Sequence, residues 1–161
     1  MDKKLSRNNK EKVLRRLEAL LQQKGFLRNK SMYFIRTSLP HLEYIHLHHV
    51  TTDTSFRITM GMHIVDDAWN TLGLNDLVGE QYRSALDSER TNVFQYAEDE
   101  HSVTMCAKEI FNFVENVIEP WYQSMRNHAF LMSYEDSLYT SKERDMLSRS
   151  IALDTDVCAV G

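Results

Sequence analysis

Hydrophobic residues recur every three or four positions between residues 9 and 25, which is typical of an amphipathic helix. In the string NKEKVLRRLEALLQQKG, the apolar positions are Val13, Leu14, Leu17, Leu20 and Leu21. Asn9 is placed to cap the start of this helix, and Gly25 is placed to end it. The remaining face is basic, so the pattern predicts a solvated amphipathic helix.

After Gly25 the pattern changes to short runs typical of strands. These runs are GFLRNKSMYFIRTS (25–38), LEYIHLHHV (42–50) and SFRITMGMHIV (55–65). Turn signals separate them: Asn29–Lys30 inside the first run, SLPH before the second and TTDTS before the third. The spacing predicts an antiparallel meander of three or four strands.

The third run alternates most regularly, so its two faces are predictable. Phe56, Ile58, Met60, Met62 and Ile64 form an apolar face, whereas Ser55, Arg57, Thr59, Gly61 and His63 form a polar one. We therefore expect one face of the sheet to be core. The opposite face meets solvent or becomes a working surface.

A long helix is predicted from EDEHSVTMCAKEIFNFVENVIEPWYQSM, residues 98–125. Its apolar stripe comprises Val103, Cys106, Ala107, Ile110, Val114, Val117, Ile118 and Trp121. Pro120 should end or kink this helix. A short helix capped by Ser141 should follow, whereas residues 66–98 give only a weak pattern of loop, short helix and possible strand.

These elements predict an α+β fold, with an antiparallel meander, an N-terminal helix, and a long C-terminal helix plus short helices on one face. The 161 residues fit one domain. We expect about residues 1–8 and 154–161 to be flexible tails.

Charge is distributed unevenly along the chain. Residues 1–36 carry 11 Lys and Arg against 3 Asp and Glu, a net +8, and the remainder carries 8 against 20, a net −12. The simplest interpretation is that the basic end folds beside the acidic part. A basic helix could also contact phosphates, but no nucleic-acid motif accompanies it, so nucleic-acid binding is not favoured.

Motifs for common chemistries are absent from the sequence. There is no GxSxG, Walker or GxGxxG motif, and no cofactor is expected. Cys106 falls on the apolar stripe, where a buried thiol is favoured over a nucleophile. The two cysteines, Cys106 and Cys158, form no disulfide framework, and no signal peptide or membrane span is recognisable, so a cytoplasmic protein is expected.

Three of the seven histidines lie within the string EYIHLHHVTTD. In a strand, His46 and His48 share one face and His49 points to the other, so all three cannot converge. His46 and His48 could chelate a metal with His63 or Asp53 as a further ligand, if the register permits. The alternative is that they are half-exposed sheet histidines.

Three stretches of the chain carry a resemblance to a known family: LLQQKGFLRNKSMYFIR, YIHLHHVTTDTSFRITMGMHI and CAKEIFNFVENVIEPWYQSM. Over roughly residues 13–125, the sequence resembles the bacterial family catalogued as domain of unknown function 4304. The resemblance implies an antiparallel sheet covered by helices and carries no active site to transfer. It also implies the context of immunity or antitoxin proteins, which bind and occlude a toxin.

The leading interpretation is a cytoplasmic protein-binding module of the immunity type, whose partner is a cognate toxin. Candidate partner-binding residues are Asp66, Asp67, Trp69, Asp76, Glu80, Glu98, Asp99, Glu100, Arg57 and His63. The acidic members would complement a basic toxin cleft. Two rivals are a metal-dependent enzyme using His46, His48 and His63, and nucleic-acid binding by the basic helix. The sequence leaves the oligomeric state open.

Overall fold

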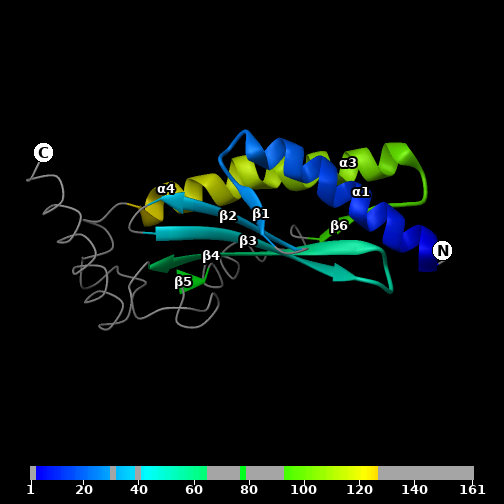
Figure 1. Ribbon diagram of the computed structural model, residues 1–161, viewed down its shortest axis with the longest axis horizontal. Helices are drawn as coiled ribbons and strands as arrows, with labels where there is room; N and C mark the ends of the chain where they lie inside the picture. The colour runs from blue at the N-terminus through cyan, green and yellow to red at the C-terminus, as the bar shows by residue number, and fades with distance from the viewer. Residues whose placement is uncertain (1–2, 30–31, 39–40, 65–76, 79–92, 127–161) are drawn as a thin grey trace, which may run out of the picture.

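An antiparallel sheet with helices along one face forms the described part of the protein (Figure 1). The structure, a computed structural model, describes residues 3–29, 32–38, 41–64, 77–78 and 93–126. These residues confirm an α+β fold with an antiparallel sheet, an N-terminal helix and a C-terminal helix. The helix predicted at Ser141 and the tail predicted at 154–161 lie outside them.

Five strands follow one another in the order β1-β2-β3-β4-β5, and β6 also pairs with β4. Both β5 and β6 pair with β4, at Gly61–Met62 and at Ser55–Arg57 respectively, and every pairing is antiparallel. The strands are β1 (Leu27–Asn29), β2 (Tyr33–Ser38), β3 (His41–Val50), β4 (Ser55–Ile64), β5 (Leu77–Val78) and β6 (Val93–Gln95). The predicted meander is confirmed, and it continues beyond β4.

The first helix, α1 (Lys3–Gln22), buries four of the five positions of the predicted apolar stripe, and Leu20 is half-buried. Val13, Leu14, Leu17 and Leu21 are fully buried. A turn follows Gln22, and Gly25 adopts a left-handed φ of 82°, which a glycine reaches without steric cost. The predicted stop signal at Gly25 is therefore confirmed.

The start of α1 differs from the prediction. The helix begins at Lys3, so Asn9 lies in its interior and residues 3–8 are helical rather than a tail. Asn9 is buried, and its Nδ2 donates to the carbonyl oxygens of Ala97 (3.4 Å) and Glu98 (3.0 Å). Its polar side chain joins α1 to the segment before the next helix. Asparagine is also a common capping residue, so the sequence alone did not distinguish this long-range contact from a cap.

The predicted C-terminal helix forms in three joined pieces: α3 (Glu100–Phe113), the π-helix η1 (Val114–Ile118) and α4 (Glu119–Met125). Pro120 occupies the first turn of α4. Proline lacks an amide proton and crowds the carbonyl one turn back, so the hydrogen-bond pattern must change just before it. The π-helix provides that change, and the predicted disruption at Pro120 is confirmed.

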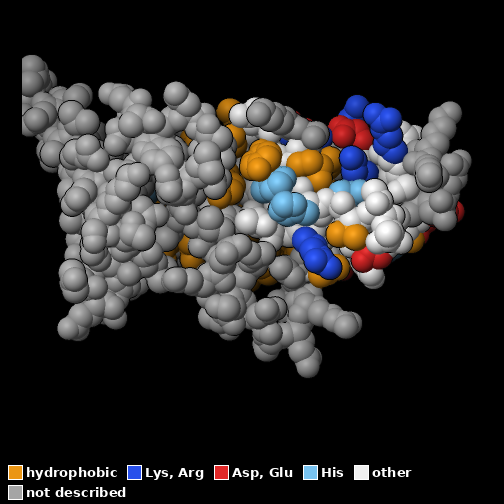
Figure 2. All heavy atoms as spheres, turned by 90° about the horizontal axis from the view of Figure 1, so that it is seen from below, with side chains coloured by type: hydrophobic (Ala, Val, Ile, Leu, Met, Phe, Trp, Pro, Cys, Tyr) orange, Lys and Arg blue, Asp and Glu red, His pale blue; other side chains and the backbone are white. Residues whose placement is uncertain are grey.

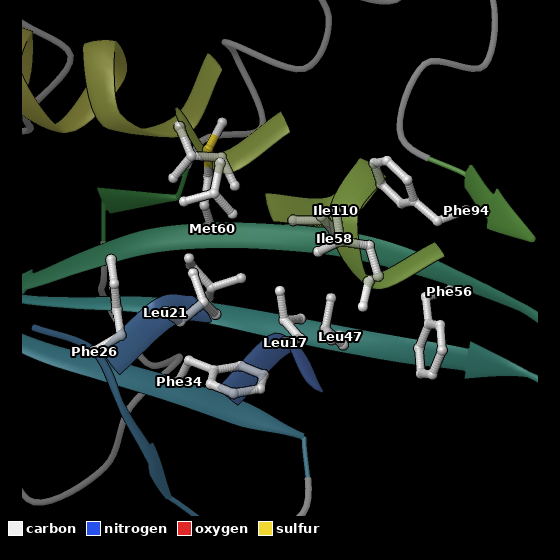
Figure 3. Packing of buried hydrophobic residues seen from close by; sticks show 14 of the residues in the cluster. Leu17, Leu21, Phe26, Phe34, Leu47, Phe56, Ile58, Met60, Phe94 and Ile110 are labelled. Atoms are coloured by element: carbon white, nitrogen blue, oxygen red, sulfur yellow. The ribbon is translucent and has the colours of Figure 1, made fainter. Parts of the chain in front are cut away.

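The core lies between the sheet and the layer formed by α1 and α3 (Figure 3). Cross-strand register places Phe34, Ile45 and Met60 on the helix-facing side of β2, β3 and β4. The predicted apolar face of β4 is confirmed, because Phe56, Ile58, Met60 and Met62 are all buried. Each fully buried side chain of this kind contributes about 1.5–3 kcal/mol. The opposite sheet face carries no helix in the described part of the chain.

Candidate functional site

Two of the three described members of the predicted acidic surface, Asp99 and Glu100, have contacts within the protein, although their side chains stay exposed. Glu100 pairs with Lys12 and with Arg16, whose Nη2 lies 2.6 Å from Glu100 Oε2. These two cations lower the pKa of Glu100. Asp99 caps α3, accepting a hydrogen bond from the Ser102 amide at 2.8 Å.

Basic α1 therefore lies beside the acidic start of α3, as expected from the uneven charge. A second link of this kind joins Lys24, in the turn after α1, to Glu115 of η1 at 2.8 Å. Of the predicted acidic triplet, Glu98 is exposed, whereas Asp99 and Glu100 have structural contacts. The other predicted partner-binding residues, Asp66, Asp67, Trp69, Asp76 and Glu80, lie outside the described residues.

The clustered histidines divide between the two sheet faces, as predicted. His46 and His48 lie on the sheet face opposite α1 and α3, paired in register with Thr59 and Arg57. We call this the open face because no helix of the described part covers it, although Tyr44 on it is buried. His49 pairs with Phe56 on the helix-facing side, and its Nε2 lies 2.7 Å from the Tyr96 hydroxyl.

The register also locates the third histidine of the proposed metal set. His63 pairs with Leu42, four residues along β3 from His46, which corresponds to about 13 Å. By strand register, position 63 lies on the same face as His46 but is not its neighbour along the sheet. Within the described ranges, no group of three His, Cys, Asp or Glu side chains is arranged to share a metal ion.

The open sheet face carries a stack of aromatic rings. Tyr33 and His46 are cross-strand neighbours, and their rings stack with centroids 4.0 Å apart and planes inclined by 5°. The His48 ring lies 4.0 Å from the His46 ring. Burial and the neighbouring His48 charge lower the pKa of His46 to about 4, so His46 is neutral at pH 7.

Arg57 adds a positive charge beside this stack. It is exposed, and it forms no ion pair within the described part of the chain. Figure 2 shows this face, with histidine side chains near its middle and hydrophobic and basic side chains around them. We define the open-face cluster as Tyr33, His46, His48 and Arg57. It combines stacked rings with a cation that has no ion-pair partner among the residues the structure describes, a composition suited to recognition.

A buried ionic network lies on the helix-facing side, and the sequence interpretation missed it. Glu43 is fully buried between two arginines: Arg36 Nε donates to it at 2.7 Å, and Arg126 Nε donates at 2.5 Å. Arg36 also donates to both carboxylate oxygens of Glu119, at 2.6 and 2.9 Å.

This network is satisfied by its own members and has a structural role. The Arg36 guanidinium lies over the Phe26 ring at 4.2 Å and also donates to the Lys24 carbonyl. It connects β2, β3 and α4 at one end of the sheet. One signal was available in the sequence, because Glu43 shares its strand face with Ile45 and Leu47, where an unpaired carboxylate would be costly.

Cys106 is buried, as predicted from its position on the apolar stripe. Its Sγ lies 3.8 Å from the Phe94 carbonyl oxygen. Burial, followed by the charge of Glu109, raises the pKa of this thiol to about 12. At neutral pH the sulfur is therefore a protonated thiol, which is a poor nucleophile.

Comparisons with protein-family models, with curated proteins and with solved structures give no match to this chain. The resemblance to domain of unknown function 4304 stays a prediction. None of the helices in the described residues is long and apolar enough to cross a membrane.

Proposed function

We propose that this protein is a cytoplasmic binding module of the bacterial immunity type, which binds a cognate toxin and occludes its working surface. The open-face cluster, Tyr33, His46, His48 and Arg57, would supply the contact. The observation that carries the proposal is the Tyr33–His46 stack beside an exposed arginine that has no ion-pair partner among the described residues.

The residue types of this cluster suit a protein interface. Tyrosine and arginine are enriched among residues that dominate binding energy, because each combines a large contact area with hydrogen-bonding groups. The Tyr33 ring is already ordered by stacking on His46, so little conformational freedom is lost on binding. Strand β3 is paired on both sides, by β2 and by β4, which holds the cluster in place.

Charge indicates the chemistry of the partner surface. Arg57 favours a carboxylate opposite it, and the stacked rings favour a flat apolar or aromatic side chain. This differs from the acidic surface predicted from sequence, since Asp99 and Glu100 are occupied by contacts with Ser102, Lys12 and Arg16. We therefore expect the toxin surface to present acidic side chains around an apolar centre.

The test uses three forms of the full chain as affinity baits in bacterial lysate. The forms are wild type, a double variant Tyr33→Ala plus Arg57→Ala, and the control Lys108→Ala, which removes an exposed cation on α3. A specific partner should be retained by the wild type and the control and lost with the double variant. The captured protein is then expressed alone and together with each form, and cell growth is recorded.

Growth arrest by the captured protein, relieved by the wild type and Lys108→Ala but not by the double variant, is the expected result. Equal retention by all three forms would move the interface away from the open face. A partner whose expression leaves growth unchanged would contradict the immunity role. Binding of labelled single-stranded RNA to the wild type, lost with the double variant, would instead show that the stacked rings bind RNA bases and not a protein partner.

A further inference from the structure

A pocket of about 630 Å³ lies between α1 and the turn joining β3 to β4. Helix α1 contributes Ser6, Arg7 and Lys10, strand β3 contributes His49, and the turn contributes Thr51, Thr52 and Thr54. The volume falls within the range of small-molecule sites, roughly 300–1,000 Å³. The described lining thus combines two cations, four hydroxyl groups and an imidazole.

The two cations of the pocket differ from the other basic residues of α1. Lys12 and Arg16 are paired with Glu100, and Arg15 is paired with Glu11. Arg7 and Lys10, in contrast, form no ion pair within the described residues. Of the two, Lys10 acts electrostatically on the lining residue His49: burial, followed by Lys10, lowers the pKa of His49, and Asp53 raises it.

No described lining residue carries a carboxylate that could neutralise these cations. The nearest candidate in the turn, Asp53, is not among the lining residues, and its Oδ1 accepts a hydrogen bond from Ser55 Oγ at 2.6 Å. Among the described lining residues the charge is therefore positive, with hydroxyl donors around it, and Asp53 acts on the lining only from outside, by raising the pKa of His49. That combination is suited to an anion with several oxygen acceptors.

One residue, Tyr96, contacts each of the three segments that line the pocket. Its hydroxyl donates to the Ser6 carbonyl at 3.3 Å and lies 2.7 Å from His49 Nε2, and its backbone accepts from Thr54 Oγ1 at 2.9 Å. A tyrosine hydroxyl has a single proton, so when it donates to Ser6 the proton in the shorter contact belongs to His49 Nε2. His49 Nδ1 then remains a hydrogen-bond acceptor in the neutral ring.

The turn itself is held in an unfavourable backbone conformation. Thr54 has a left-handed φ of 49°, which is uncommon for a β-branched residue. The Tyr96 amide donates to the Thr54 carbonyl at 3.1 Å and so fixes this conformation. Strain of this kind persists only where the surroundings impose it, and it occurs often at binding sites. The threonine hydroxyls are thus presented on a fixed turn.

We propose that this pocket binds a phosphate group carried by a small molecule, with Arg7 and Lys10 neutralising the charge and the Thr51 and Thr52 hydroxyls donating to the phosphate oxygens. The pocket is larger than an inorganic phosphate needs, so the remaining volume would accept the body of a molecule the size of a nucleoside monophosphate. The site is separate from the open-face cluster, so the two proposals are independent.

The test is an NMR titration of the full-length protein with two probes, inorganic phosphate and adenosine 5′-monophosphate. Both should produce saturable shifts at the Thr51 and Thr52 amides and at the His49 ring. The nucleotide should bind roughly tenfold tighter or better, since its body fills the rest of the pocket. A double variant, Arg7→Gln plus Lys10→Gln, should weaken both probes by about tenfold for each cation removed.

The matched control, Arg15→Gln plus Lys108→Gln, removes the same charge from exposed positions outside the pocket lining. It should retain binding. A third variant, Thr52→Val, removes one hydroxyl with little change of shape and should weaken binding without affecting thermal unfolding. Equal weakening by the two charge variants would assign the effect to net charge and overturn the proposal. Absence of saturable shifts in the wild type with both probes would also overturn it.

Discussion

Tyr44 lies directly across the β3–β4 ladder from Gly61, and its ring occupies the space that a side chain at residue 61 would need. A Cβ atom built at Gly61 would lie far inside contact distance of the Tyr44 ring and hydroxyl. Glycine is therefore required there by a neighbour rather than by its own backbone conformation. An aromatic ring covering a cross-strand glycine restores the packing that the glycine lacks.

We predict that Gly61→Ala destabilises the protein by about 1–3 kcal/mol, because the ring of Tyr44 must leave its place. Urea unfolding followed by circular dichroism measures this change. In a Tyr44→Ala background the same substitution should cost little, since the clash is gone. An equal cost of Gly61→Ala in both backgrounds would show that the ring is not the cause.

The Glu43 network gives a second prediction, on stability. Glu43→Ala should lower the free energy of unfolding by about 3–5 kcal/mol, because Arg36 and Arg126 lose a buried carboxylate partner. Glu109→Ala, an exposed control on α3, should change it by no more than about 0.5 kcal/mol. Urea unfolding of both variants provides the comparison. A Glu43→Ala cost as small as that of the control would mean that the network contributes no net stability.

Local patterns were sufficient to predict much of this fold. Alternation along residues 55–64 identified the buried face of β4, and the spacing of leucines identified the buried stripe of α1. The separation of His49 from His46 and His48 also followed from alternation alone. These features depend on how often side chains return to the same face of a strand or helix, and that period is visible in the spacing of hydrophobic residues along the sequence.

Long-range polar contacts could not be predicted in this way. Arg36 meets Glu119 across 83 residues, and Asn9 meets Glu98 across 89. A charged or amide side chain does not indicate its partner in sequence, so Asn9 was predicted to cap the helix, and the contacts of Glu100 with Lys12 and Arg16 were not predicted. The distance between positions 63 and 46 likewise could not be predicted without the register of β3 and β4. A one-residue slip in that register would move one strand past the other and change which residues face each other.

The burial of Cys106 leads to a prediction about reactivity. Because its pKa is raised to about 12, the native protein should resist alkylation by iodoacetamide at neutral pH. Modification should follow the rate of opening of the core and become rapid in denaturant. Peptide mass spectrometry after timed quenching reads Cys106 separately from Cys158. Rapid labelling of Cys106 without denaturant would contradict the burial of this thiol.

The low pKa of His46 predicts a pH-dependent stability. Its folded value, about 4, lies below the unfolded value of about 6.5. Between these values the unfolded chain binds a proton that the folded chain does not, so protonation favours unfolding. The stabilising effect of neutral His46 is complete above pH 6.5 and is lost as the pH falls towards 4. In His46→Gln, stability should therefore fall less steeply over this window, as measured by urea unfolding.

The neighbouring His48 separates the two causes of this shift. Burial is the larger cause and the charge of His48 the smaller, so His48→Gln should raise the pKa of His46 only part of the way towards its ordinary value. An NMR titration of the His46 ring signals measures this pKa directly. A full return to the ordinary value would show that His48 alone sets the shift. An ordinary pKa for His46 in the wild type would show that solvent reaches the stacked ring freely, and that the open-face cluster is not ordered as the Tyr33–His46 contact indicates.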